Sequence, residues 1–437
     1  MRLDETRWVY GGGLTPEWRW VGRLRLGQAL AGVKKALGAL KTAPAPVRKA
    51  GYDKGLKLFL SAKGPARDRL AVHPCLDYWL YLFDKHFGLP VSEPDWHLHY
   101  GAFQGFAAAL ALETGRPFET EARLDPSGGF YLYGTRYYTD RPGRVKVGRK
   151  AAAAAGLKEL VEVQPGLVVD DRSWLTTHGV TMHGLKRVDE AEARRFAAPI
   201  KRALDEMAEL DPPLRDELVD MTRVVVPLEN PMSFGSVSSS YMNLRGAICL
   251  SHAEDALLQA ETMIHEYCHQ KMNQLLAVDP LLLPGQSGQV FYSPWRPDAR
   301  RLRGLALGAH AFLNVGRYLS RALARKEYPE AEAIEVMVNV SRRALQVETA
   351  LRSLVGYAEL TEFGRRFALR MWRGVMELHH AVAHYPPALL AEQRAAAEEH
   401  KRKHSLFDTG LHKQEDFKDT LRRAAFLTPK SDDEVPA

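Results

Sequence analysis

Residues 256–277 decide how the chain is interpreted: Ala-Leu-Leu-Gln-Ala-Glu-Thr-Met-Ile-His-Glu-Tyr-Cys-His-Gln-Lys-Met-Asn-Gln-Leu-Leu-Ala. Their pattern predicts a helix over about 253–277, opened by a capping box at Ser251–Glu254. Residues four apart share one face of a helix, so His265 and His269 can present imidazole nitrogens to one ion. We therefore expect a site for a divalent transition metal on this helix.

Glu266 follows the first histidine and can reach a water on that ion. A catalytic metal also needs a third protein ligand and an open position. The metzincin pattern requires Gly and His where the chain has Met272 and Leu275. The gluzincin pattern requires a downstream Glu, yet no Glu occurs between Glu266 and Glu327.

His310 is the one histidine between His269 and His379, and we predict it to be the third ligand. Asp279 and Asp298 are the alternatives. The competing interpretation of His310 is a hydrogen-bonded core histidine. Three imidazoles suit zinc and also suit Fe(II), so the ligand set does not choose the metal.

Two further segments follow the metal helix: 291–300, Phe-Tyr-Ser-Pro-Trp-Arg-Pro-Asp-Ala-Arg, and 308–312, Gly-Ala-His-Ala-Phe. Together with 265–276 they resemble the HExxH-type 2-oxoglutarate-dependent peptide β-hydroxylases, and the likeness is best over 224–318. The resemblance implies Fe(II) and 2-oxoglutarate as cofactors. It also implies hydroxylation of a β-carbon in a ribosomally made precursor peptide.

A 2-oxoglutarate enzyme must hold the distal carboxylate of its cosubstrate, for which a guanidinium is well shaped. Arg296 and Arg300 are the candidates in this segment, and Tyr292 and Trp295 are candidate walls of the pocket. The alternative is that Trp295 anchors a core and that the arginines are surface charges paired with Asp298.

Two other functions remain open. In a zinc metallopeptidase, Glu266 would be the general base that deprotonates a metal-bound water. In a non-catalytic peptide-binding protein, the metal would be a structural brace. In each case a peptide could pair with the strand 246–250 by β-augmentation. The pairs His97/His99, His380/His384 and His400/His404 lack a Glu at the required place, and we expect them to be structural or solvated.

Lys and Arg exceed Asp and Glu by a net +7, a small excess that does not favour a nucleic-acid partner. The three cysteines, Cys75, Cys249 and Cys268, fit neither a disulfide framework nor a zinc ribbon, which indicates a reducing compartment. The first residues do not resemble a signal peptide, and no long apolar run occurs. We expect a cytoplasmic protein without a membrane partner, and the sequence leaves its oligomeric state open.

The periodicities predict an α+β, mainly helical fold in which a zincin-like metal helix packs on a small mixed sheet. We expect a helical N-terminal region over 1–115 and a small β-rich region over 116–185. The metal-binding catalytic domain should cover 186–410, with a helical C-terminal part, and a C-terminal tail should cover 411–437.

Overall fold

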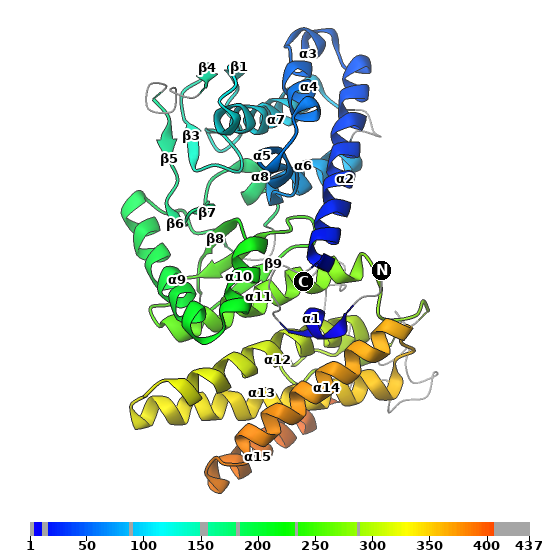
Figure 1. Ribbon diagram of the computed structural model, residues 1–437, viewed down its shortest axis with the longest axis vertical. Coiled ribbons are helices and arrows are strands. Elements are labelled where there is room, and N and C mark those ends of the chain that lie inside the picture. Colours follow the sequence, from blue (N-terminus) through cyan, green and yellow to red (C-terminus); the bar gives the residue numbers. More distant parts are fainter. Residues whose placement is uncertain are drawn as a thin grey trace. The chain divides into compact units, whose positions relative to one another are not determined.

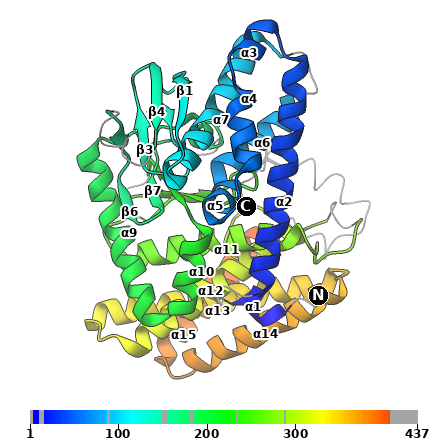
Figure 2. The same cartoon turned by 45° about the horizontal axis from the view of Figure 1, so that its top comes forward.

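The computed structural model describes residues 4–10, 16–86, 91–148, 156–180, 184–231, 235–285 and 289–405. Helices predominate and the strands form small sheets, so the chain has the mainly helical α+β class expected (Figures 1 and 2). The tail expected at 411–437 lies outside the described residues. Within the described ranges, no helix combines the length and the apolar character needed to cross a bilayer.

Two compact units interleave along the chain. The first takes in the described parts of 1–15, 203–218 and 260–437, and the second takes in those of 16–202 and 219–259. Each unit is thus assembled from separated stretches, whereas the expected regions 1–115, 116–185 and 186–410 are continuous in sequence. All of the predicted site residues belong to the first unit.

The second unit contains a helical layer built around α7 (Glu93–Thr114). Ser92 caps α7 by accepting a hydrogen bond from the Asp95 amide, and Gly115 ends it in the left-handed region with φ 66°. The other helices are α2 (Pro16–Ala39), α3 (Ala45–Lys49), α4 (Asp53–Ser61), α5 (Pro65–Ala71), α6 (Pro74–His86) and α8 (Trp174–Thr177), with a 3-10 turn η1 (Leu40–Thr42).

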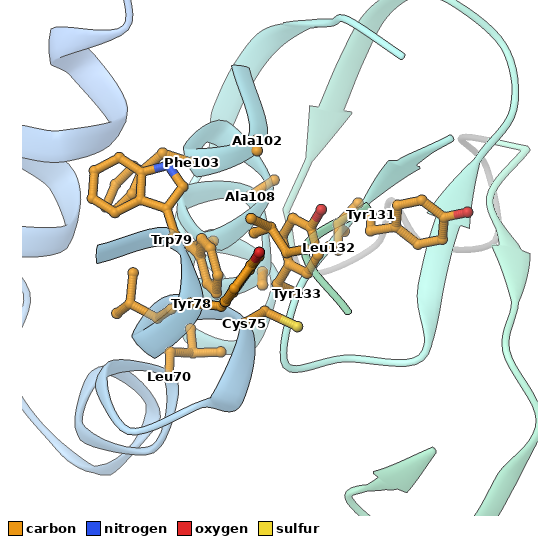
Figure 3. Close-up of a cluster of buried hydrophobic side chains, with 14 of the residues drawn as sticks. Leu70, Cys75, Tyr78, Trp79, Ala102, Phe103, Ala108, Tyr131, Leu132 and Tyr133 are labelled. Atoms are coloured by element: carbon orange, nitrogen blue, oxygen red, sulfur yellow. The ribbon is translucent and has the colours of Figure 1, made fainter. Parts of the chain in front are cut away.

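The core of the second unit is rich in aromatic side chains from α6, α7 and the segment after α7 (Figure 3). The ring centres of Trp79 and Phe103 lie 4.8 Å apart, and the Trp79 indole donates a hydrogen bond to the His99 carbonyl. Gly105 lets α7 approach β2 (Phe130–Tyr131), because a Cβ there would lie 2.0 Å from the Tyr131 carbonyl oxygen. This burial of large rings supplies much of the hydrophobic stabilisation of the unit.

Short strands fill the β-rich stretch expected from the Gly and Pro residues of this region. β1 (Phe118–Ala122) pairs with β4 (Gly143–Val147), and β2 pairs with β3 (Tyr137–Thr139), which also pairs with β5 (Lys158–Glu159). All three pairings are antiparallel.

A five-stranded mixed sheet has the order β6-β7-β8-β10-β9. Its strands are β6 (Glu162–Gln164), β7 (Leu167–Val169), β8 (Val224–Leu228), β9 (Ser238–Ser240) and β10 (Ala247–Ser251). β10 is parallel to β8 on one side and antiparallel to β9 on the other. The expectation that strand 246–250 could receive a peptide by β-augmentation was wrong, because both of its hydrogen-bonding edges are already paired.

The first unit contains four long helices that run alongside one another (Figure 1). They are α12 (Leu302–Arg325), α13 (Glu330–Tyr357), α14 (Glu362–Val382) and α15 (Pro387–His404). Before α12, β11 (Val290–Phe291) and β12 (Arg300–Arg301) pair antiparallel, with Phe291 opposite Arg300. This pairing folds the 291–300 segment into a loop whose ends meet.

Three helices contribute residues to both units: α9 (Glu190–Leu210), α10 (Pro212–Met221) and α11 (Ala256–Leu276). α11 is the predicted metal helix, but it starts later than expected. Ser251 is still part of β10, where its hydroxyl accepts a hydrogen bond from the Val237 amide. Asp255 takes the capping role instead, since its carboxylate accepts from the Leu257 amide at 2.7 Å.

The short helix α1 (Glu5–Val9) is tied to the first unit through its own backbone carbonyls. The last carbonyls of a helix lack partners within the helix and need donors from elsewhere. Three side chains of α11 and α12 bind them. Lys271 donates to the carbonyls of Arg7 and Tyr10, at 2.6 and 2.8 Å. His310 binds the carbonyl of Trp8, at 2.9 Å, and Asn314 donates to that of Val9, at 2.8 Å. Lys271 also forms a buried ion pair with Glu217 of α10, at 2.6 Å.

Candidate metal centre

Helix α11 carries the His-Glu-x-x-His motif in a largely buried setting. Met263, Ile264, Cys268 and Met272 are fully buried around it. A helix buried on most of its surface is fixed by packing, which holds the side chains of the motif in place. The motif is therefore presented from a rigid element.

The Nε2 atoms of His265 and His269 share a hydrogen bond of 2.9 Å, in which one ring donates and the other accepts, and the ring planes are at 89°. Two metal–nitrogen bonds of about 2.0–2.1 Å at a right angle place two ligating nitrogens about 2.9 Å apart. The pair thus has the spacing of two adjacent ligands of one ion. The buried Nδ1 of His269 has no hydrogen-bond partner among the described residues.

Both imidazoles are held in the neutral form that a metal ligand needs. Burial, and then the charge of Arg300, lower the pKa of His269 to about 4. Burial, followed by His269 and Arg343, lowers the pKa of His265 well below its ordinary value. The pair is therefore ready to bind a cation near neutral pH without first losing protons.

Glu266 lies next to the pair in sequence and is almost fully buried, at 2% exposure. Burial raises the pKa of the neighbouring Cys268 thiol. The charge of Lys271 opposes this rise, and the carboxylates of Glu217 and Glu266 add to it. A buried carboxylate at this position can accept a hydrogen bond from a water or a ligand on the ion, or act as a base.

His310 lies on α12 and is buried, and its Nε2 is bound to the Trp8 carbonyl. Burial is the main cause that lowers its pKa to about 3. Within the ranges that the structure describes, no three His, Cys, Asp or Glu side chains gather as a metal-binding group. The structure thus brings His265 and His269 together without His310, whose role as third ligand stays a prediction.

The two carboxylates considered as alternative ligands have other partners. Asp279 accepts hydrogen bonds from the Thr361 hydroxyl and the Leu281 amide, both at 2.8 Å. Asp298 forms ion pairs with Arg296, at 2.7 Å, and with Arg300, at 3.0 Å.

The two arginines predicted to bind the cosubstrate therefore differ in their exposure to solvent. The side chain of Arg296 is 49% exposed, whereas that of Arg300 is 11% exposed and close enough to His269 to lower its pKa. Both share the carboxylate of Asp298, as the alternative interpretation of this segment expected. Arg300 is therefore a largely buried cation near His269, whereas Arg296 is half exposed.

The side chains of Trp295 and Tyr292, both in the 291–300 loop, contact different partners. The ring of Trp295 lies 5.3 Å from that of Phe312, which in turn lies 4.7 Å from the His265 ring. Gly308 makes room for the indole, because a Cβ there would lie 2.2 Å from it. The Tyr292 hydroxyl is hydrogen-bonded to His400 Nδ1 at 2.7 Å, and burial raises its pKa to about 12.

Three residues near the histidine pair were not predicted as site residues. Phe312 contacts both His265 and the guanidinium of Arg343, whose central carbon lies 4.2 Å from the centre of the Phe312 ring. Lys271 holds α1, as described above. Arg343 is on α13 and Phe312 on α12, so their neighbourhood depends on helix packing rather than on spacing along the chain.

The other histidine pairs have local partners. His97 shares a hydrogen bond of 2.8 Å with the Tyr52 hydroxyl, and His99 stacks on Trp79 with ring centres 4.2 Å apart. The ring centres of His380 and His384 are 5.7 Å apart, wider than the 4.5 Å of His265 and His269. Those of His400 and His404 are 4.6 Å apart, but His400 Nδ1 is hydrogen-bonded to the Tyr292 hydroxyl. His265 and His269 remain the candidate pair.

No protein-family model matches the chain, and none of the curated proteins compared with it gives a significant match. The functional interpretation therefore rests on the residues themselves and on the resemblance of their motifs.

Proposed function

We propose that the chain is an Fe(II)- and 2-oxoglutarate-dependent hydroxylase that acts on a β-carbon of a residue in a ribosomally made peptide. The observation that carries the proposal is the convergence of two neutral imidazole nitrogens, 2.9 Å apart, with guanidinium charges beside both rings. The peptide as partner comes from the resemblance of residues 265–276, 291–300 and 308–312 to peptide β-hydroxylases.

The charges around the pair favour an anionic ligand on the metal. Arg300 lies near His269 and Arg343 near His265, and each guanidinium also has a carboxylate partner, Asp298 at 3.0 Å and Glu261 at 3.8 Å. Cations that are only partly neutralised favour a ligand that brings negative charge to the metal. A 2-oxo dicarboxylate supplies one negative group for the metal and another for a guanidinium, whereas the hydroxide formed from water in a peptidase supplies only the first.

Each residue then has a defined task. His265 and His269 hold the ion, and His310 is the predicted third ligand. Glu266 would orient a ligand of the ion, whose hydrogen bond its buried carboxylate accepts. When bound, iron and its 2-oxo acid would activate dioxygen, which is the oxidant of the hydroxylation and is consumed together with the 2-oxo acid, while the aromatic rings of Trp295 and Phe312 limit the access of water.

A zinc metallopeptidase is the second candidate, and a specific observation favours it. Glu266 follows His265 directly and is buried, which are properties of the general base of a metallopeptidase. A third possibility is a non-catalytic peptide-binding protein with a structural metal. The three cysteines are buried and none of them forms a disulfide, in keeping with our proposal of a cytoplasmic location.

An anaerobic titration tests the proposal. Apo-protein is titrated with Fe(II) and then with 2-oxoglutarate, and the visible charge-transfer band of a chelated 2-oxo acid is recorded. We expect the band in the wild type, its loss in His269→Ala and its retention in His380→Ala, which alters the rival histidine pair. Iron binding without the band, together with a preference for zinc, would make the peptidase the leading candidate.

The variant Glu266→Gln separates the three candidates. A peptidase should lose nearly all activity, because the base is gone. A hydroxylase should lose part of its activity and keep the band, and a structural site should lose only stability.

A further inference from the structure

Arg343 is a buried cation whose charge is poorly compensated. Its side chain is 17% exposed, and its ion pair with Glu261 is long, at 3.8 Å, although Glu261 still favours the charge. Its Nη1 donates to the Gln346 amide oxygen at 3.0 Å, while its buried Nε has no hydrogen-bond partner among the described residues. Burial lowers its pKa, which shows that its surroundings disfavour the charge. A buried cation in this state is stabilised when an anion binds to it.

Arg296 and Arg300 are in the opposite state. Each forms an ion pair of 3.0 Å or less with Asp298. A guanidinium that already has a close carboxylate gains less from a second one than a guanidinium without such a partner. The arginine with the most to gain from an incoming carboxylate is therefore Arg343.

The position of Arg343 also suits a ligand on the metal. The Phe312 ring lies 4.2 Å from the guanidinium carbon and 4.7 Å from the His265 ring, so the guanidinium is within about 9 Å of that ring. The two carboxyl carbons of extended 2-oxoglutarate are about 5 Å apart, given C–C bonds of about 1.5 Å. A 2-oxo acid bound to an ion at His265 would thus have its distal carboxylate within reach of Arg343.

We propose that Arg343 binds the distal carboxylate of the 2-oxo acid cosubstrate and thereby makes the site selective for dicarboxylates. The inference rests on the proposed function, and it replaces Arg296 and Arg300 in this role. Phe312 holds the guanidinium by a cation–π contact, so that the donors are oriented before the ligand arrives.

The test compares two ligands of equal chain length, 2-oxoglutarate and 2-oxopentanoate, which has a methyl group in place of the distal carboxylate. Their Kd values are measured on the anaerobic Fe(II)-loaded protein from the charge-transfer band, without turnover. The variants are Arg343→Met, Arg300→Met and, as a control on the same helix, Arg352→Met, whose side chain is 67% exposed. The double variant Arg343→Met/Glu261→Gln avoids leaving a buried carboxylate alone.

We expect the wild type to prefer 2-oxoglutarate, and Arg343→Met to bind it about 10- to 100-fold more weakly, as for loss of a charge-assisted hydrogen bond. The Kd of 2-oxopentanoate should change less than about twofold in the same variant. The double variant Arg343→Met/Glu261→Gln should give the same pattern of Kd values as Arg343→Met. Arg352→Met should match the wild type in both titrations.

Three results would overturn the assignment. If Arg300→Met abolishes the preference and Arg343→Met keeps it, Arg300 holds the distal carboxylate. If both ligands weaken equally in Arg343→Met, the residue only supports the structure of the site. If the wild type binds Fe(II) but neither 2-oxo acid, the proposed function fails together with this inference.

Discussion

Replacement of Lys271 by methionine should destabilise the first unit strongly. The Lys271 ammonium is 2.6 Å from the Glu217 carboxylate, and the two side chains are 3% and 2% exposed. It also donates to the carbonyls of Arg7 and Tyr10. Methionine keeps the length of the side chain but leaves a buried carboxylate without its cation, for which we expect a loss of about 3–5 kcal/mol.

A second variant separates the charge from the carbonyls. Lys271→Met/Glu217→Leu removes both charges, so the two α1 carbonyls lose their donor and the Tyr267 hydroxyl loses its interaction with Glu217. The hydrogen bond from Lys271 to the Arg7 carbonyl is partly exposed, and we expect the free energy of unfolding to fall by about 1–3 kcal/mol in total. The double variant should therefore be more stable than the single one, although it carries more changes.

Urea unfolding followed by circular dichroism gives the two losses, and hydrogen exchange of residues 4–10 reports on α1 directly. Both variants should exchange faster than the wild type at these residues. A free energy of unfolding of Lys271→Met within about 1 kcal/mol of the wild-type value would contradict this expectation, as would a double variant that is less stable than Lys271→Met.

Other changes test other contacts. Burial, and then nearby guanidiniums, lower the pKa of His73 to about 3, so only the unfolded chain takes up this proton between pH 6.5 and 3. The stability of the wild type relative to His73→Phe should hence fall by about 1.4 kcal/mol per pH unit below 6.5, and a constant difference would contradict this. Gly308→Ala should displace Trp295 and cost about 1–3 kcal/mol in urea unfolding, while Gly27→Ala, in open space on a helix, should not destabilise. Tyr292→Phe should cost about 0.5–1.5 kcal/mol and shift 2-oxoglutarate affinity less than twofold, because its hydroxyl is bound to α15; a tenfold loss would place it in the cosubstrate pocket.

The sequence predicted what depends on local spacing. The helix that carries the His-Glu-x-x-His motif and the helical C-terminal part follow from apolar periodicity, and the structure contains both. The pairing of His265 with His269 follows from a separation of four residues on a helix. In each case the deciding residues lie within one element.

The errors concern partners that are distant in sequence. β10 looked like an edge because nothing in 246–250 reveals that β8 and β9 flank it. Ser251 looked like a cap because sequence cannot tell a residue that ends a strand from one that starts a helix. Arg343 was missed because only the packing of α11, α12 and α13 brings it near His265, 78 residues away in sequence.

The carbonyl contacts of α1 have a consequence for how the chain folds during synthesis. The bond between His310 and the Trp8 carbonyl joins residues 302 positions apart. At roughly 5–20 residues per second, the ribosome needs on the order of 15–60 s to produce the second partner after the first has emerged. Residues 4–10 must therefore wait without their final partners until α12 has been made, and only then can the first unit close around α1.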